Sequence, residues 1–523
     1  MNLYSFHELP VPLHQKDSVK QKLAQELRIR EHEIQSFKVL RYSLDSRKKN
    51  APHWSFNVQF EYAGAPLSHA RLSLTAPVSE HLEDDAYYRS IPFPQEIAIV
   101  GAGPAGLWAA LHFLRNGFRV HLYEQGKPVE ERMKDIRRFF VNRKFNPYSN
   151  VLFGEGGAGT FSDGKLNTRT RNIFSQTVLE DMVAAGISRE ILTFAKPHIG
   201  TDKLFYLLKN LRRQILELGG TIHFENRLED IQLSSGRLSQ IRINGKWISA
   251  EALVLASGHS AREVYALLRE RGIALESKAF AMGVRVEHPQ ALINACQLGK
   301  NADTRLTGNA EYALTAKTLN GTSAAYSFCM CPGGVLVPCA SEAGTFATNG
   351  MSHSHRRGPY ANGAIAVPIP ASETLLGNLN AQRNLEQKAF EIGGKNYAAP
   401  AQTIEAFLHR KTDQKLPHST YPCGLAPTNH WEWLGKEICA SLAEGFQNFE
   451  RKIPGFIKNG LIVSPETRTS SPLRICRHND SLESVSAAGL YVIGEGAGYA
   501  GGIVTSAADG VRLACRARKE KTA

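Results

Sequence analysis

The strongest constraint on the fold is a glycine motif close to residue 100. Residues 101–106 read Gly-Ala-Gly-Pro-Ala-Gly, and they lie between an apolar run at 97–100 and a longer one at 107–116. This order predicts a strand, a tight turn and a helix. Residues 119–124 predict a second strand that ends in a carboxylate, Glu124. Because strand, turn, helix, strand and acid follow one another, the segment indicates a β-α-β unit that binds a dinucleotide.

Each residue of this motif has a predicted role at a pyrophosphate. Gly101 allows the tight turn, Gly103 lets the backbone approach the pyrophosphate, and Gly106 lets the helix pack close to the strand. Pro104 and Ala105 begin the helix, whose N-terminus presents free N–H groups and a partial positive charge to phosphate.

Glu124 is expected to accept hydrogen bonds from the ribose hydroxyls of the adenosine. Its charge disfavours the 2′-phosphate of NADP at this site. The motif alone does not separate FAD from NAD.

Two segments after the β-α-β unit favour FAD. A predicted strand at 221–224 is followed by Arg227 and Leu228, where dinucleotide-binding proteins of this kind place backbone beside the adenine. Residues 253–259 have the pattern of the returning strand and turn that close over the dinucleotide, with Gly258 in the turn.

The segment 491–504 is similar to the C-terminal flavin motif of FAD proteins. Glu495, which follows Gly494, is the acid expected to bind the ribityl chain. Gly502 and Ile503 begin the next helix, whose N-terminus is expected to point at the flavin ring and to stabilise the anionic reduced flavin.

These features together amount to a family resemblance. The chain resembles the FAD-dependent dehydrogenases of the glutathione-reductase structural class and, more closely, a family of two-domain FAD-dependent oxidoreductases with no settled substrate. The resemblance covers roughly residues 90–515 and is carried by blocks at 149–166, 197–202, 329–334, 466–472 and 494–502. It implies FAD as the cofactor. In one departure, Glu495 stands where most relatives in the wider class carry Asp.

We predict an α/β protein with a Rossmann-like FAD-binding domain, an inserted mixed α+β substrate domain and a small N-terminal α+β domain. The N-terminal domain is expected at residues 1–90, and the FAD-binding domain at 91–275 with a return segment at 460–523. The substrate domain is expected at 276–459.

A glycine-rich loop at 154–164 is a second candidate for cofactor contact. Its glycines, among them Gly156 and Gly157, would let the backbone lie flat against a ring or a phosphate, although the loop could also be only a tight connection. Asp163 and Lys165 are hypothesised to meet the flavin N5 edge or the substrate.

Cys329 and Cys331 form a Cys-x-Cys pair that is a candidate for disulfide exchange beside a flavin. A disulfide across this spacing would be strained, so packed or substrate-lining thiols are the alternative. The other cysteines of the chain are mostly widely spaced and show no metal-binding pattern, so we predict no metal site and mostly reduced thiols.

Four more side chains are candidates for work on the substrate. His353 and His355 could be acid/base groups or simply polar loop residues. Arg468 and Arg474 flank a Thr-Ser-Ser-Pro segment, and their guanidinium groups suit a carboxylate or phosphate substrate as well as a structural ion pair.

The composition limits partners and location. The net charge is +13, but the basic residues are scattered, which argues against a nucleic-acid partner. The sequence has no run of eighteen apolar residues, and its start lacks the pattern of a signal peptide, so we expect no membrane span and a cytoplasmic location.

The expected activity is that of an FAD-dependent oxidoreductase acting on a small molecule, with hydride exchange at flavin N5 and NAD(P)H as a transient redox partner. A flavin-dependent RNA-modifying enzyme and a non-catalytic FAD-binding protein remain as alternatives. The substrate and the oligomeric state are left open.

Overall fold

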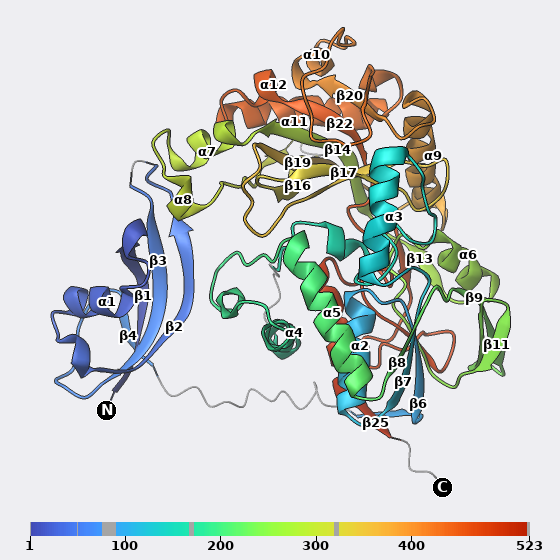
Figure 1. The fold of residues 1–523 in the computed structure, drawn as a ribbon, viewed down its shortest axis with the longest axis horizontal. Helices are drawn as coiled ribbons and strands as arrows, with labels where there is room; N and C mark the ends of the chain where they lie inside the picture. The colour runs from blue at the N-terminus through green and yellow to red at the C-terminus, as the bar shows by residue number, and fades with distance from the viewer. Residues whose placement is uncertain (1, 50, 76–89, 167–171, 318–323, 520–523) are drawn as a thin grey trace.

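The computed structural model of the chain describes residues 2–49, 51–75, 90–166, 172–317 and 324–519. Its framework is an N-terminal antiparallel sheet, a central parallel sheet and a larger mixed sheet (Figure 1).

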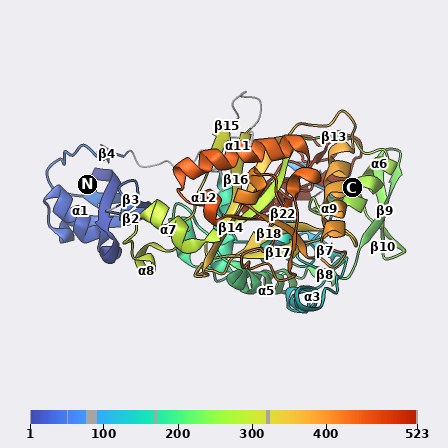
Figure 2. The ribbon, with the colours of Figure 1, turned by 90° about the horizontal axis from the view of Figure 1, so that it is seen from above.

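The N-terminal sheet forms a small unit with helix α1 (Val19–Leu27). Its strands run in the order β2-β3-β1-β4: β1 (Asn2–Pro12), β2 (Ile34–Asp45), β3 (His53–Tyr62) and β4 (Leu72–Leu74). Alternate side chains of β3 are buried, because one face of the sheet packs on α1. Figures 1 and 2 show this unit to one side of the molecule, where Tyr42 packs on Phe194 and Lys16 pairs with Glu190.

The predicted β-α-β unit forms the middle of the parallel sheet. The strand order is β24-β12-β6-β7-β8, with β6 (Glu96–Val100), β7 (Arg119–Glu124), β8 (Thr221–Phe224), β12 (Leu253–Leu255) and β24 (Leu490–Val492). Because β6 lies between β7 and β12, the connections run to opposite sides of it, and a crevice opens at the carboxyl ends of these strands. The glycine turn after β6 therefore lies where such sheets bind ligands.

Helices cover one face of this sheet through a shared apolar core: α2 (Pro104–Arg115), α4 (Ile173–Ala184), α5 (Thr201–Glu217) and α13 (Ile503–Arg516). Helix α13 approaches α2 so closely that a Cβ on Gly510 would lie 2.3 Å from the carbonyl oxygen of Ala105. Glycine is therefore required at position 510.

The other face of the parallel sheet packs on a small antiparallel sheet and helix α6 (Arg262–Glu270). This small sheet contains β9 (Leu228–Ser234), β10 (Arg237–Ile243) and β11 (Lys246–Ser249). Helix α3 (Val129–Asn142) follows β7. At the end of the described chain, β25 (Ala517–Lys519) pairs with β5 (Ile91–Phe93), which brings the two ends of the domain together.

The second domain is built on a seven-stranded sheet in the order β15-β16-β19-β14-β22-β20-β21. The strands are β14 (Phe280–Pro289), β15 (Thr315–Lys317), β16 (Ala324–Cys331), β19 (Tyr360–Ile369), β20 (Ala399–Thr403), β21 (Leu425–Pro427) and β22 (Leu461–Glu466). A pair of strands, β17 (Val335–Cys339) and β18 (Ala347–Met351), forms a separate ribbon. The accompanying helices are α7 (Gln290–Leu298), α8 (Thr304–Thr307), α9 (Gly377–Ile392), α10 (Ile404–Leu408), α11 (Lys436–Lys452) and α12 (Phe456–Asn459).

One predicted domain boundary is wrong. We placed the return to the FAD-binding domain at residue 460, but β22 pairs with β14 and β20 and so belongs to the second domain. The chain returns only at β23 (Leu473–Ile475), which pairs with β13 (Leu275–Ser277). An apolar run predicts a strand but not the sheet that it joins, because its hydrogen-bonding partners are distant in sequence.

Candidate cofactor and substrate site

A cavity of about 690 Å³ opens at the carboxyl ends of the parallel strands and extends to the second domain. This volume lies within the range of roughly 300–1,000 Å³ that is usual for ligand pockets. Of the residues that we predicted to contact a cofactor, twelve line it: Gly101, Gly103, Pro104, Ala105, Glu124, Gly157, Leu228, Gly258, Gly494, Glu495, Gly502 and Ile503. The cavity thus brings together residues almost 400 positions apart in the sequence.

The three glycines of the first motif differ in their surroundings. Gly101 has a φ of +104°, and a Cβ there would lie 2.3 Å from the carbonyl oxygen of Ala256. Gly106 does not line the cavity, because its Cα faces the carbonyl oxygen of Gly101, which a Cβ would approach to 1.9 Å. A Cβ on Gly103 would meet no atom within 4 Å, so this backbone faces open space in the cavity.

Glu124 fixes the glycine turn through backbone hydrogen bonds. Its Oε2 accepts from the N–H of Ala102 at 2.8 Å, and its Oε1 accepts from the N–H groups of Gly126 and Gly154 at 2.9 and 3.0 Å. A carboxylate has about four acceptor positions. One is therefore left for a ribose hydroxyl, the partner that the sequence predicted.

The glycine-rich loop is held by Arg132, a residue that sequence reasoning missed. Arg132 lies on α3, is fully buried, and its guanidinium donates to five backbone carbonyls: those of Asn150, Val151, Gly154, Glu155 and Gly157. Burial lowers the pKa of Arg132 to about 9, despite the charges of Glu124 and Glu155, so it remains charged at neutral pH. A lone arginine in an amphipathic helix gave no signal of this role.

Only part of the predicted loop contact lies at the cavity. Gly157 lines it, whereas Gly156 does not, and a Cβ on Gly156 would lie 2.4 Å from a methyl carbon of Leu208 on α5. Gly156 therefore allows the loop to pack on a helix, which corrects its predicted place beside the cofactor.

The glycine-rich loop ends in a cluster of charged side chains around Asp163. The Asp163 side chain is completely buried. Its carboxylate accepts from Lys165 Nζ at 2.7 Å and from Arg356 Nε at 2.9 Å, and also from the hydroxyl of Ser352. Although burial raises the pKa of Asp163, the charges of Lys165 and Arg356 outweigh it and hold this pKa well below its ordinary value.

Lys165 connects this cluster to the cavity wall. Its ammonium also donates to the carbonyl oxygen of Met330 on β16 and lies 3.9 Å from Glu311 Oε2, so among the described residues two of its three N–H groups have hydrogen-bond partners. Burial lowers the pKa of Lys165, but the nearby carboxylate of Asp163 raises it more, so Lys165 stays charged.

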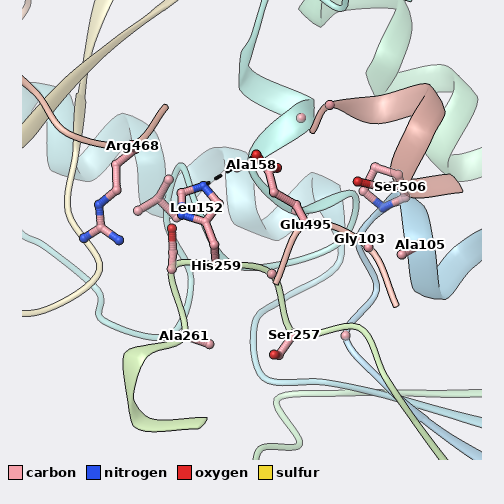
Figure 3. A pocket seen from close by; sticks show the side chains of 18 of the residues that line it. Gly103, Ala105, Leu152, Ala158, Ser257, His259, Ala261, Arg468, Glu495 and Ser506 are labelled. Atoms are coloured by element: carbon pink, nitrogen blue, oxygen red, sulfur yellow. Dashed lines mark ion pairs between the residues drawn. The ribbon is translucent and has the colours of Figure 1, made fainter. Parts of the chain in front are cut away.

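His259 occupies the middle of the cavity wall, between Arg468 and Glu495 (Figure 3). Burial and the charges of Arg468 and Arg262 lower the pKa of His259 to about 3, so the ring is neutral at pH 7. Its Nε2 lies 3.9 Å from Glu495 Oε1, and its buried Nδ1 has no hydrogen-bond partner among the described residues. We did not single out His259 from the sequence, although its place directly after Gly258 was a usable signal.

Glu495 is the acid expected at the ribityl chain. Burial raises its pKa to about 7, an effect that Lys278 opposes and Cys329 reinforces. Its carboxyl therefore changes protonation near neutral pH.

Of the two arginines that flank the Thr-Ser-Ser-Pro segment, Arg468 lines the cavity. It is buried, and its Nη2 donates to Glu386 Oε2 at 2.9 Å and to Ser341 Oγ at 2.7 Å. Its Nη1 has no hydrogen-bond partner within the described part of the chain. Arg474 does not line the cavity and instead pairs with Glu276 at the surface.

The two predicted histidines lie outside the cavity. The His353 side chain is 72% exposed, with its Nδ1 3.9 Å from Asp202, and His355 is also exposed. Both histidines lie in the loop after β18, and their side chains are exposed to solvent. The structure therefore gives them no role at this site.

The two cysteines of the Cys-x-Cys pair are separated by the cavity wall. Cys329 lines the cavity, and Cys331 is completely buried behind it. All eight cysteines are free thiols.

Within the described residues no group of His, Cys, Asp or Glu could hold a metal ion, and no helix is long and apolar enough to cross a membrane.

Comparisons with known proteins match several parts of the chain. The family model "FAD-dependent protein, C-terminal domain-like" matches residues 279–469, and "Domain of unknown function (DUF8436)" matches residues 7–61. An uncharacterized protein of Clostridium beijerinckii is 39% identical over 507 residues, which are 95% of each chain. Thiamine thiazole synthase of Thermotoga maritima is 26% identical over 202 residues, 36% of this chain and 66% of that protein.

Among solved structures, L-proline dehydrogenase from P. horikoshii matches 81% of this chain and 93% of its own, with a TM-score of 0.36 and 11% identity. Quinol fumarate reductase FrdA of E. coli matches 81% of this chain and 69% of its own, with a TM-score of 0.36 and 14% identity.

Proposed function

Since this chain belongs to the same family of FAD-dependent proteins as the Clostridium beijerinckii relative, we propose that it is an oxidoreductase that exchanges a hydride between a small substrate and FAD. The observation that carries the proposal is the single cavity shared by the glycine turn, the N-terminus of α13 and the wall of the second domain. A cavity of this extent supports the proposal because it has room for a cofactor and a substrate next to one another.

The backbone of this cavity suits a long cofactor. Gly103, Gly258 and Gly502 all line it, and a Cβ on any of them would meet no atom within 4 Å. Side chains at these positions would fill the space that a nucleotide needs, so the glycines form a cradle. The buried and unpaired Nδ1 of His259 adds a polar atom that a ligand could satisfy.

The predicted residues can be assigned to parts of FAD along this cradle. The N-terminus of α2, which begins at Pro104, would hold the pyrophosphate, and Glu124 the adenosine ribose. Leu228 would lie beside the adenine and Glu495 beside the ribityl chain. The N-terminus of α13 would face the flavin ring.

When bound, the flavin supplies a hydride acceptor at N5. The chain contributes two cations at the second-domain end of the cavity, Lys165 and Arg468. Within the described residues, the buried Nη1 of Arg468 has no hydrogen-bond partner. Both would bind a carboxylate or phosphate on the substrate. NAD(P)H remains the proposed redox partner and would bind transiently.

The visible spectrum of the purified protein tests the proposal. We expect flavin absorbance, and chromatography of the heat-released cofactor should identify FAD. Anaerobic titration with NADH, NADPH and small organic acids should then reduce the bound flavin. A colourless protein that does not take up FAD contradicts the proposed cofactor, and an FAD-bound protein that none of these compounds reduces favours the non-catalytic alternative.

A further inference from the structure

Strand β16 contains an irregularity at Cys329 that the proposed function does not use. In its pairing with β19, Phe328 faces Ala364 and Cys331 faces Asn362, so β16 has one residue more than its partner over this interval. Cys329 has a φ of +45° in this bulge. Bulges of this kind re-aim side chains and are common beside active sites. Here the bulge places Cys329 at the cavity while Cys331 points into the protein.

The two cysteines are in contact despite their different exposure. The Cys331 thiol donates to the carbonyl oxygen of Cys329, with its Sγ 3.5 Å from that oxygen. Interaction with Cys331 also lowers the pKa of the Cys329 thiol. Even a fully extended chain puts residues two apart no more than about 7 Å from one another, at the limit of a disulfide's reach. Because Cys329 lies at the cavity and Cys331 behind its wall, forming the disulfide requires a local rearrangement of the bulge.

Positive charges surround Cys329. The Arg285 guanidinium donates to the Cys329 carbonyl oxygen at 3.4 Å, and the Lys165 ammonium donates to the next carbonyl, that of Met330. Both cations are held in place, Arg285 by Glu466 at 2.8 Å and Lys165 by Asp163 at 2.7 Å. Fixed cations beside a thiol favour its thiolate, which is the reactive form.

Other buried cysteines of the chain lack this environment. Burial raises the pKa of Cys339 and of Cys439 to about 12, as expected for thiols packed in a core. The pKa of Cys329 moves in the opposite direction, and that of Cys331 is raised well above its usual value by its hydrogen bond to Cys329 and by burial. An accessible thiolate with a protonated partner behind it is the arrangement of an attacking and a resolving thiol.

We propose that Cys329 and Cys331 are a redox-active dithiol, in which Cys329 attacks a small disulfide in the cavity and Cys331 resolves the product. The inference rests on the proposed function in one respect, namely that FAD in the same cavity takes up or returns the two electrons. The substrate class is a low-molecular-weight disulfide or dithiol.

The reaction is a thiol–disulfide exchange that conserves atoms and electrons. The Cys329 thiolate forms a bond to one sulfur of the disulfide, whose S–S bond breaks and releases a thiolate. Cys331 then forms a bond to the Cys329 sulfur and releases the second thiol, with the Cys331 proton passing to that leaving group. The substrate disulfide gains two electrons, and the cysteine pair loses two and becomes a disulfide.

Hydroxyethyl disulfide added to the reduced full-length protein tests this inference. Peptide mapping by mass spectrometry should find a disulfide between Cys329 and Cys331, formed at least about tenfold faster than any adduct on Cys296, which is only partly exposed. In Cys331→Ser, the reaction should stop at a mixed disulfide on Cys329. Cys339→Ser is the matched control, because Cys339 is buried, lies a short distance along the chain and should not change the outcome.

Two results would overturn the proposal. One is a wild-type protein in which Cys329 is modified but never linked to Cys331, and the other is a Cys329 that reacts no faster than Cys296. Both are read from the wild-type chain and need no variant to fold. The same mapping on FAD-loaded and FAD-stripped protein separates the two proposals. Formation of the disulfide in a protein that never binds FAD refutes only the proposed function, and its absence in an FAD-loaded protein refutes only this inference.

Discussion

The pKa of the Cys329 thiol is held below its ordinary value. The main cause is the hydrogen bond from Cys331, and the charges of Arg285 and Lys165 add to it against the opposing effects of burial and Asp163. Glu495 on the same cavity also interacts with this thiol. The thiolate of Cys329 is therefore easier to form than that of an ordinary cysteine.

Alkylation by iodoacetamide should follow this pKa. We expect the rate at Cys329 to reach its plateau at a lower pH than the rate at Cys296, because the thiolate is the nucleophile and the pKa of Cys329 is lowered. Peptide-resolved alkylation rates between pH 5 and pH 10 measure it. Cys296 is the internal control, since burial raises its pKa and its rate should still be rising at high pH. The same pH dependence of the alkylation rate at both cysteines would show that Arg285 and Lys165 do not favour the Cys329 thiolate.

Gly103 offers a direct test of cofactor placement. A side chain there meets no protein atom, so Gly103→Val should fold, but the side chain would occupy the space expected for the pyrophosphate. We expect FAD affinity to fall at least tenfold, about 1.4 kcal/mol. The flavin content of the purified variant and the titration of its flavin-free form with FAD measure this change in affinity.

Gly236→Val is the control for Gly103→Val. Gly236 also has free space around its Cα, but it lies in the β9–β10 hairpin away from the cavity. Its φ of +76° makes the substitution strained, so any loss of FAD through destabilisation alone would appear in the control. Full FAD occupancy in Gly103→Val would show that the pyrophosphate lies elsewhere.

Helix α3 stabilises the cavity without lining it. Through Arg132 it donates hydrogen bonds to the carbonyls of Gly154, Glu155 and Gly157 in the glycine-rich loop, and this loop contributes Gly157 and Asp163 to the cavity wall. A loop with so many glycines has little conformational preference of its own. One buried guanidinium replaces the side-chain packing that the loop lacks.

Arg132→Met should therefore loosen the loop. Several buried carbonyls would lose a charged donor, and we expect a loss of at least about 3 kcal/mol in the free energy of unfolding, together with weaker FAD binding. Urea unfolding and FAD titration measure the two effects. Arg138→Met on the same helix changes an exposed side chain and should have little effect on either. Equal stability of the two variants would show that Arg132 does not hold the loop.

The two domains are joined by buried ion pairs close to the cavity. Glu386 on α9 accepts from Arg262 on α6 at 2.9 Å and from Arg468, which follows β22, also at 2.9 Å. Thr467 donates to the same carboxylate at 2.6 Å. Because Arg262 belongs to the first domain and Glu386 to the second, this carboxylate fixes the wall of the cavity where the domains meet.

Glu386→Gln should remove the charge that balances the buried Arg468 guanidinium and leave Arg262 with only Glu342, whose Oε1 lies 3.2 Å from its Nη1. We expect a loss of about 3–5 kcal/mol in the free energy of unfolding, as is usual when one partner of a buried pair is removed. Denaturant unfolding of the FAD-loaded protein measures it. Glu391→Gln on the same helix is the control, because Glu391 is exposed. A loss below about 1 kcal/mol would mean that the domains are held mainly by apolar packing.

The sequence by itself determined the parts of this protein that depend on local order. The β-α-β unit at residues 96–124 and the C-terminal strand and helix could be read directly, because a short apolar strand, a glycine turn and a helix occupy neighbouring positions. Most of the predicted cofactor residues line the cavity for the same reason: Gly103 and Gly502 each lie at a helix start whose direction the local backbone fixes.

The tertiary structure decided what depends on distant partners. The sheet that β22 joins, the burial of Arg132 under a loop, and the exposure of His353 all result from contacts between segments far apart in the chain. The cysteine pair is the clearest case. Residues two apart on a regular strand point to the same side, so the sequence cannot separate Cys329 from Cys331. A single extra residue in the pairing with β19 turns one thiol to the cavity and leaves the other in the core.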